Sequence, residues 1–187
     1  MVMYYSDQRQ RFANYSLPTA QQFAKEAGLS LRVEHQGVYE TPFMQKVRFT
    51  LEALQAADRV VYSDIDVLFR PGAGARLEDL FSGPFAMSVD SNGFCTGFMT
   101  ALKTPEVERF LRIWWELGMR IDPNLTLYDQ GTFKLLNENF QWVKDLVAVI
   151  PVTLVSNPEC ATPGAIAHHV WSRDERLERI ENFSWGA

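Results

Sequence analysis

The segment 59–69, Arg-Val-Val-Tyr-Ser-Asp-Ile-Asp-Val-Leu-Phe, constrains the fold more than any other part of the chain. Its Val-Val-Tyr run is β-branched and aromatic, which is typical of a buried strand. Asp64 and Asp66 follow this run directly, so they lie where the chain leaves the core. In an open α/β sheet that position, the carboxyl end of a strand, is where ligands bind.

The two carboxylates of this segment indicate a cation. Side chains two positions apart in an extended segment point to the same side, so Asp64 and Asp66 can converge on one object. Like charges held together raise a pKa unless a cation lies between them. Carboxylate oxygens suit Mg²⁺ and Mn²⁺. We therefore predict a divalent metal here, although an Asp-x-Asp triplet alone also fits an ordinary surface turn.

Composition narrows the class of protein. The chain has 187 residues, 47% hydrophobic and 22% charged, which is ordinary for a globular domain. Its net charge of −5 argues against a nucleic-acid surface, so a bound phosphate would need local cations or a metal. No apolar run is long enough to span a membrane.

The N-terminus and the cysteines bear on the cellular location of the protein. The segment 1–5 is too short for the apolar region of a signal peptide and turns polar at once. Cys95 and Cys160 show no metal-ligand spacing, and a single pair does not establish a disulfide. We expect a location in the cytoplasm, with the cytoplasmic face of the membrane as the second option.

Strand and helix patterns alternate along the chain. We expect strands at 2–5, 29–34, 60–62, 85–89, 94–102, 147–151, 152–155 and 165–171. We expect helices at 14–27, after the Thr-Pro pairs at 41–42 and 104–105, and at 77–81, 128–137 and 173–180. This order predicts a single α/β domain over 1–187, with a mainly parallel central sheet flanked by helices, as in Rossmann-like folds.

Two polar features accompany the strands near the acidic segment. Lys46 falls in the first turn of the helix before it, close to the carboxyl edge of the sheet, although most lysines are simply solvated. The segment Cys95-Thr96-Gly97 breaks an apolar strand with small residues. Gly97 either lets a ligand approach the backbone closely or marks a β-bulge.

Two more polar pairs occur late in the chain. Asp129 and Gln130 open a helix, where an aspartate can also serve as a cap. His168 and His169 lie in the last apolar strand, and histidine is a common metal ligand as well as a frequent structural residue. Neighbours on a strand point to opposite faces, so only one of the two can reach the metal. The pattern does not choose between them, because both faces are apolar.

Taken together and in this order, these residues resemble the nucleotide-diphospho-sugar transferases of the GT-A-type glycosyltransferase fold, in particular the glycogenin and galactosyltransferase-like group. The segment 59–69 resembles that family's metal-binding strand, and 95–99 resembles its Asn-Thr/Ser-Gly-Phe strand. The resemblance implies a metal held by Asp64, Asp66 and His168. It implies donor contacts from Asp7, Lys46, Asp64, Thr96 and Gly97. It implies catalytic roles beside the donor sugar for Asp129 and Gln130.

The resemblance also implies an activity. It is the metal-dependent transfer, with Mn²⁺ or Mg²⁺, of a sugar from a nucleotide-diphosphate donor, a UDP-sugar first of all. The acceptor would be a glycan, a lipid or a protein, and the anomeric configuration would be retained. The chain departs from the family pattern in two places. Cys95 stands where the family has Asn, and the segment 170–173 lacks the family's Gly and Lys after the late histidine.

Two other functions fit parts of the pattern. A non-catalytic module that binds a nucleotide sugar or glycan could use the same fold, since fold alone does not establish activity. A haloacid-dehalogenase-type phosphatase also places Asp-x-Asp after an apolar strand, with Asp64 as nucleophile and Asp66 as acid/base. That resemblance further requires a late Gly-Asp-x-x-x-Asp element, which this chain does not have.

Overall fold

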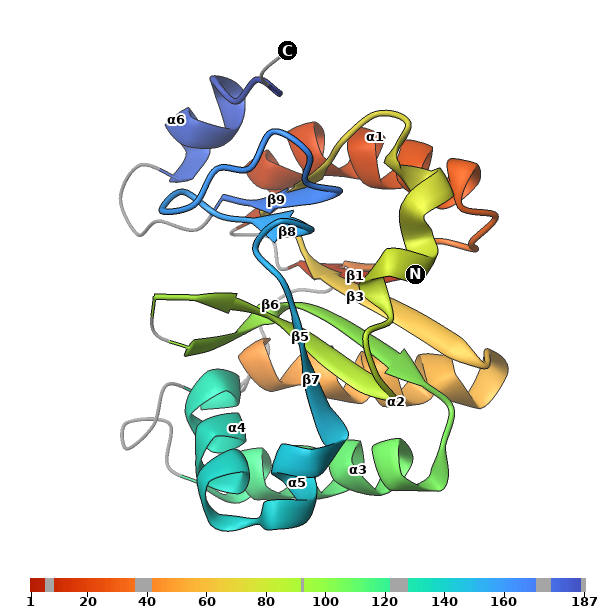
Figure 1. Ribbon diagram of the computed structural model, residues 1–187, viewed down its shortest axis with the longest axis vertical. Coiled ribbons are helices and arrows are strands. Elements are labelled where there is room, and N and C mark those ends of the chain that lie inside the picture. The colour runs from red at the N-terminus through yellow and green to blue at the C-terminus, as the bar shows by residue number, and fades with distance from the viewer. Residues whose placement is uncertain (6–8, 36–41, 92, 122–127, 171–175, 186–187) are drawn as a thin grey trace.

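The computed structural model describes residues 1–5, 9–35, 42–91, 93–121, 128–170 and 176–185. A six-stranded sheet has the order β2-β1-β3-β6-β5-β7, and a three-stranded sheet has the order β4-β9-β8 (Figure 1). The strands are β1 (Val2–Tyr5), β2 (Arg32–His35), β3 (Arg59–Asp64), β4 (Val67–Phe69), β5 (Phe85–Asp90), β6 (Gly93–Leu102), β7 (Val147–Ile150), β8 (Val155–Ser156) and β9 (Ala167–His169). The helices are α1 (Gln10–Glu26), η2 (Pro42–Met44), α2 (Gln45–Ala56), η3 (Ala73–Leu80), α3 (Pro105–Arg120), α4 (Tyr128–Asn139), α5 (Gln141–Leu146) and α6 (Arg176–Glu181).

The central sheet is mainly parallel, as the alternating pattern predicts. Strand β1 pairs in parallel with β2 and β3, and β5 pairs in parallel with β7. Only β6 among these strands runs the other way, antiparallel to both β3 and β5. The carboxyl ends of β1 and β3 therefore meet at one edge, where the acidic segment begins.

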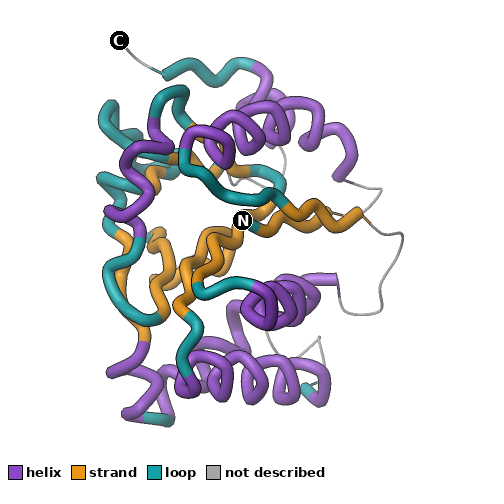
Figure 2. The backbone as a smooth tube through the Cα atoms, turned by 90° about the vertical axis from the view of Figure 1, so that its right-hand side faces the viewer, coloured by secondary structure: helices purple, strands orange, loops and turns teal. Residues whose placement is uncertain are grey.

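Two hydrophobic cores lie on opposite faces of this sheet, and Figure 2 shows the helical layers on either side of the strands. One core contains residues of α1, β4, η3, β9 and α6, and the other contains residues of α2, α3, α4 and α5. Within β3, Val61 belongs to the first core, whereas Val60 and Tyr62 belong to the second. Because side chains alternate along a strand, Asp64 lies on the side of Tyr62, which is the side of α2.

The second, smaller sheet was not expected from the sequence. Strand β4 leaves the acidic segment and pairs antiparallel with β9, with Val67 opposite His169. The amide of Val170 also donates to the carbonyl of Asp66 at 2.8 Å. This pairing brings a strand from the end of the chain directly against the turn that carries the two aspartates.

Several element boundaries differ from those that the sequence predicts. Helix α1 begins at Gln10, because buried Phe12 and Ala13 extend it well before Pro18, whose ring lies at the exposed surface. The predicted strand at 165–171 is only Ala167–His169, and α5 was not predicted. In the described part of the chain, no helix is both long enough and apolar enough to cross a membrane.

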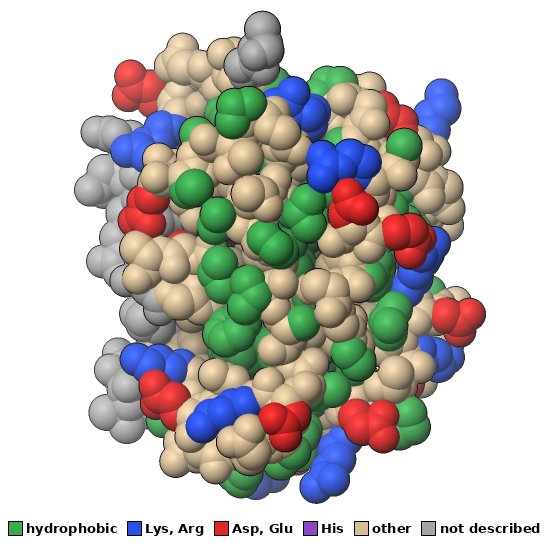
Figure 3. All heavy atoms as spheres, viewed as in Figure 1, with side chains coloured by type: hydrophobic (Ala, Val, Ile, Leu, Met, Phe, Trp, Pro, Cys, Tyr) green, Lys and Arg blue, Asp and Glu red, His purple; other side chains and the backbone are tan. Residues whose placement is uncertain are grey.

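One edge of the central sheet is only partly covered. In Figure 3, hydrophobic side chains gather toward the middle of the face that Figure 1 presents, with charged side chains mostly around them. Val149 of the edge strand β7 is one of the exposed large hydrophobic residues. The hydroxyl of Ser82 donates to the carbonyl of Val149 at 3.0 Å. A side chain outside the sheet therefore forms a hydrogen bond with a backbone carbonyl of the edge strand, a strand type that leaves backbone groups unpaired.

Candidate metal and donor site

Asp64 is the last residue of β3, and two neighbours fix its carboxylate. Lys46 of α2 donates from Nζ to Oδ2 at 3.0 Å, and the hydroxyl of Tyr62 donates to Oδ1 at 2.7 Å. Both contacts follow from the side of β3 on which Asp64 lies. Lys46 itself is buried, with a side chain only 6% exposed. The predicted position of Lys46 beside the acidic segment is therefore what the structure shows.

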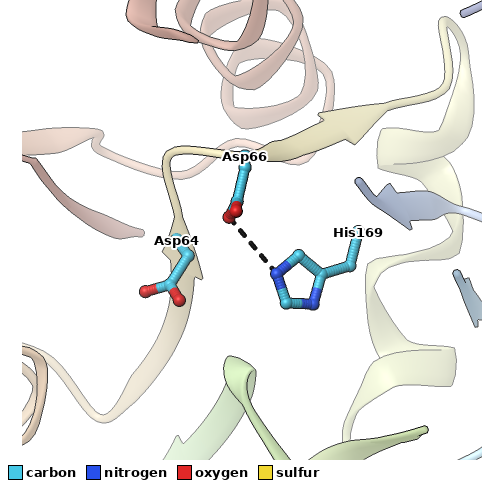
Figure 4. A group of neighbouring side chains, drawn as sticks. All are labelled: Asp64, Asp66 and His169. Carbon is cyan, nitrogen blue, oxygen red and sulfur yellow. Dashed lines mark ion pairs between the residues drawn. The ribbon is translucent and has the colours of Figure 1, made fainter. Parts of the chain in front are cut away.

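Asp66 lies past the end of β3, in the turn before β4, and its carboxylate turns toward β9. It is buried, and its Oδ1 lies 3.2 Å from Nε2 of His169. Asp64, Asp66 and His169 each offer a ligand atom, and these atoms all lie within 4.8 Å of one another. Figure 4 shows the Asp66 carboxylate directed at the His169 imidazole, with Asp64 on the adjoining strand. Two carboxylates and one imidazole form a donor set that suits Mn²⁺ or Mg²⁺.

A second group of side chains adjoins the first through Lys46. Its Nζ also lies 3.0 Å from Oδ2 of Asp129, at the start of α4. The hydroxyl of Thr96 donates to the same carboxylate oxygen, and Nε1 of Trp114 donates to the Asp129 carbonyl at 3.0 Å. Lys46, Thr96 and Asp129 are all buried. Helices α2 and α4 and strand β6 thus meet around one ammonium group.

The charges in this site compensate one another. Burial alone would lower the pKa of Lys46, but the carboxylates of Asp129 and Asp64 outweigh it and raise that pKa. Burial raises the pKa of Asp64, and Lys46 opposes that rise. Burial would also lower the pKa of His169, but contact with Cys95 and Asp66 holds it well above its usual value. Lys46 and His169 therefore place two positive charges against the carboxylates of Asp64, Asp66 and Asp129, and a metal bound by His169 would have to displace the proton from its Nε2.

Strand β6 is irregular where it passes the site. Its pairing with β5 shifts register between Met87 and Ser88, whose partners are Met99 and Cys95. A β-bulge was one of the two interpretations of this segment, and bulges commonly re-aim side chains next to functional sites. The other interpretation, close approach of a group to the backbone at Gly97, also holds. A Cβ at this position would lie 2.2 Å from Cε1 of His169. The group that approaches the backbone is thus the imidazole.

Comparisons with known proteins find the same architecture. No protein-family model matches this sequence, and no curated protein matches it. A glycosyltransferase involved in glycosylation of the major capsid of PBCV-1 superimposes with a TM-score of 0.74 at 17% identity, over 96% of this chain and 98% of that one. Apo-form glycosyltransferase GlyE of Streptococcus pneumoniae gives 0.65 at 14% identity, over 98% of this chain and 60% of that one. Galactosyltransferase LgtC, solved with donor and acceptor sugar analogs, gives 0.51 at 13% identity, over 96% and 94%.

The chain has the GT-A glycosyltransferase fold. The α/β class with a helix-flanked, mainly parallel sheet, predicted from the sequence, is thereby confirmed. These likenesses concern the fold. They assign no role to any residue of this GT-A chain.

That geometry brings most of the predicted site residues together. Lys46, Asp64, Thr96 and Asp129 form one connected network, and Asp66 adjoins it. Gln130 is half-buried at the next position of α4. Asp7 lies outside the described residues. The catalytic, donor-binding and metal-binding roles of these residues stay predictions.

The late histidines are placed differently from the predicted assignment. His169, and not His168, faces Asp64 and Asp66. The Nδ1 atom of His168 lies 2.8 Å from the Ser156 hydroxyl, and its ring stacks on Phe183 with centroids 4.4 Å apart. Burial, followed by the charge of His169, lowers the pKa of His168 to about 4. The prediction that His168 faces the two aspartates is therefore wrong. The pairing of β9 with β4 decides which histidine faces them, and the sequence does not reveal this pairing.

Sequence reasoning missed two residues that support the site. Tyr62 was read only as part of a buried strand, yet its hydroxyl contacts Asp64. Trp114 lies buried in the core, and its Nε1 donates a hydrogen bond to the backbone carbonyl of Asp129. A signal existed for Tyr62, because it precedes Asp64 by two positions and so shares its face. No comparable signal connects Trp114 with a residue beyond the end of its helix.

Proposed function

We propose that this protein is a metal-dependent glycosyltransferase that takes a sugar from a nucleotide-diphosphate donor, a UDP-sugar first of all. The observation that carries the proposal is the convergence of Asp64, Asp66 and His169 within 4.8 Å, on a GT-A fold. Lys46 and the Tyr62 hydroxyl contact Asp64, and His169 contacts Asp66, so the carboxylates are held in place for a cation. Mn²⁺ or Mg²⁺ is the cofactor that this donor set fits.

The chemistry follows from where charge develops. When a glycosidic bond to a diphosphate breaks, the leaving group gains negative charge, and a divalent metal bound there acts as a Lewis acid. Asp64, Asp66 and His169 would hold that metal. Lys46 adds a fixed positive charge on the α2 side of Asp64 and is available to a phosphate once Asp64 turns to the metal.

The remaining residues serve the sugar side of the donor. Asp129 is oriented by Lys46 and Thr96, so its carboxylate keeps a fixed position beside the metal group. A preorganised carboxylate can stabilise an oxocarbenium-like state electrostatically, and Gln130 is next to it on α4. The resemblance in sequence adds retention of configuration to this proposal. The acceptor is a glycan, a lipid or a protein.

A hydrolysis assay tests this function without knowledge of the acceptor. With Mn²⁺ present, the protein should slowly release UDP from at least one UDP-sugar in a panel, because water can replace an absent acceptor. EDTA should abolish the release. The matched pair His169→Ala and His168→Ala sharpens the test, since only the first removes a proposed ligand. His169→Ala should lose metal-dependent release and His168→Ala should retain most of it.

The alternatives predict other results. Tight, Mn²⁺-dependent binding of a UDP-sugar without release in any condition would indicate a binding module in place of a transferase. Release that persists in EDTA, or the opposite ranking of the two histidine variants, would contradict the metal site as we assign it.

A further inference from the structure

The imidazole of His169 is held on three sides, and two of them belong to strand β6. Its Nε2 faces Oδ1 of Asp66 at 3.2 Å, and its Nδ1 lies 3.4 Å from Sγ of Cys95. The third contact is Gly97, where a Cβ would lie 2.2 Å from Cε1 and 2.8 Å from Nε2 of the ring. Both positions of β6 face the ring, as these contacts show.

We propose that Cys95 and Gly97 are positioning residues that seat the metal-binding imidazole of His169: the thiol accepts the hydrogen bond from Nδ1–H, and the glycine leaves room for the ring. This inference rests on the proposed function, since it concerns the same metal site. It assigns the segment 95–97 two tasks, because Thr96 on the other face contacts Asp129 and Lys46.

The chemistry of a metal-bound imidazole requires such an acceptor. A neutral imidazole that binds a metal through Nε2 carries its proton on Nδ1. That proton is almost always donated to a second group, which fixes the tautomer and the orientation of the ring. In the described part of the chain, the Cys95 sulfur lies within hydrogen-bond reach of Nδ1. Cys95 is buried, so water has little access to take its place.

The position of the ring explains why residue 97 has no side chain. A contact of 2.2 Å between a Cβ and Cε1 is impossible for real atoms, so Gly97→Ala would push either the ring or β6 away. The ring cannot retreat freely, because Asp66 and Cys95 hold its two nitrogen atoms. The absence of a side chain at Gly97 therefore allows the imidazole of His169 to pack against the backbone of β6.

Mn²⁺ affinity of the 187-residue protein tests the role of Cys95. Two variants separate the hydrogen bond from packing: Cys95→Val fills the space without an acceptor, and Cys95→Ser keeps an acceptor. Cys95→Val should weaken Mn²⁺ binding roughly 10- to 100-fold, the usual cost of losing such a partner of a metal ligand. Cys95→Ser should recover most of that loss. Cys160→Ala, a change at the exposed cysteine, should bind Mn²⁺ as the wild type does.

Gly97→Ala provides the second arm, and it should also weaken Mn²⁺ binding by at least about 10-fold. Circular dichroism and urea titration without metal confirm that each variant is folded. Wild-type affinity in Cys95→Val, or a serine variant as weak as the valine variant, would overturn the role of the thiol. Wild-type affinity in Gly97→Ala would overturn the role of the glycine. If the wild type binds no Mn²⁺, the proposed function fails and this inference fails with it. If the wild type binds Mn²⁺ and the variants bind it with the same affinity, only this inference fails.

Discussion

Asp66→Asn should lower the turnover of a donor sugar at least about 100-fold, the loss typical of removing one fixed electrostatic group from a reaction centre. Asn keeps the size of the side chain and removes the negative charge that the proposed metal requires. The protein should stay folded. Without Asp66, His169 loses a carboxylate that raises its pKa, so it can become neutral and does not remain a buried, unpaired cation.

The free energy of unfolding gives the control for this variant. In the absence of metal it should change by no more than about 3 kcal/mol, the upper value for a hydrogen bond to a charged group. Asp58→Asn alters an exposed aspartate and should leave both turnover and stability unchanged. An Asp66→Asn protein that turns over donor at the wild-type rate would remove Asp66 from the metal site.

Lys46→Met should destabilise the fold by about 3 to 5 kcal/mol, the cost of removing one partner from a buried ion pair. Methionine fills a similar volume but leaves the carboxylates of Asp64 and Asp129 without the ammonium that both contact at 3.0 Å. Urea denaturation measures the loss. Lys134→Met is the matched control, because Lys134 is 72% exposed and pairs with Glu138 along one helix. That pair should contribute less than about 1 kcal/mol.

The Lys46→Met deficit should also depend on pH in a defined direction. Burial already raises the pKa of Asp64, and Lys46 opposes the rise, so removing Lys46 should raise that pKa further. A group whose pKa is higher in the folded state binds more protons there, so stability is greater at low pH and falls as pH increases through the folded-state pKa. The variant should therefore approach the wild type as pH is lowered toward 5. A deficit that is no larger than that of Lys134→Met, or that grows on acidification, would contradict the buried network.

Much of the central fold and part of the site could be predicted from the sequence. The run Val60-Val61-Tyr62 predicts a strand because its residues are β-branched and aromatic, and β3 spans Arg59–Asp64 with that run buried. Thr104 and the proline after it predict the start of α3, where the Thr104 side chain accepts from the Val107 amide at 3.2 Å. In both cases the information is local: a few adjacent residues suffice.

What the sequence could not supply depends on distant contacts. Strands β4, β8 and β9 are two or three residues long, too short for a periodic pattern, and they exist because they pair with one another. The choice between His168 and His169 depends on that pairing. The early start of α1 likewise depends on the burial of Phe12 and Ala13, which offsets the usual cost of Pro18 inside a helix.

Calorimetry of UDP binding tests the central claim most directly, namely that Asp64, Asp66 and His169 hold a divalent metal that binds a nucleotide diphosphate. The protein should bind UDP at least about 10-fold more tightly with Mn²⁺ than with EDTA, a difference of about 1.4 kcal/mol, because a metal held by Asp64, Asp66 and His169 would offset the negative charge of the diphosphate. The difference should disappear in His169→Ala. Equal affinity for UDP with Mn²⁺ and with EDTA in the wild type would contradict the account.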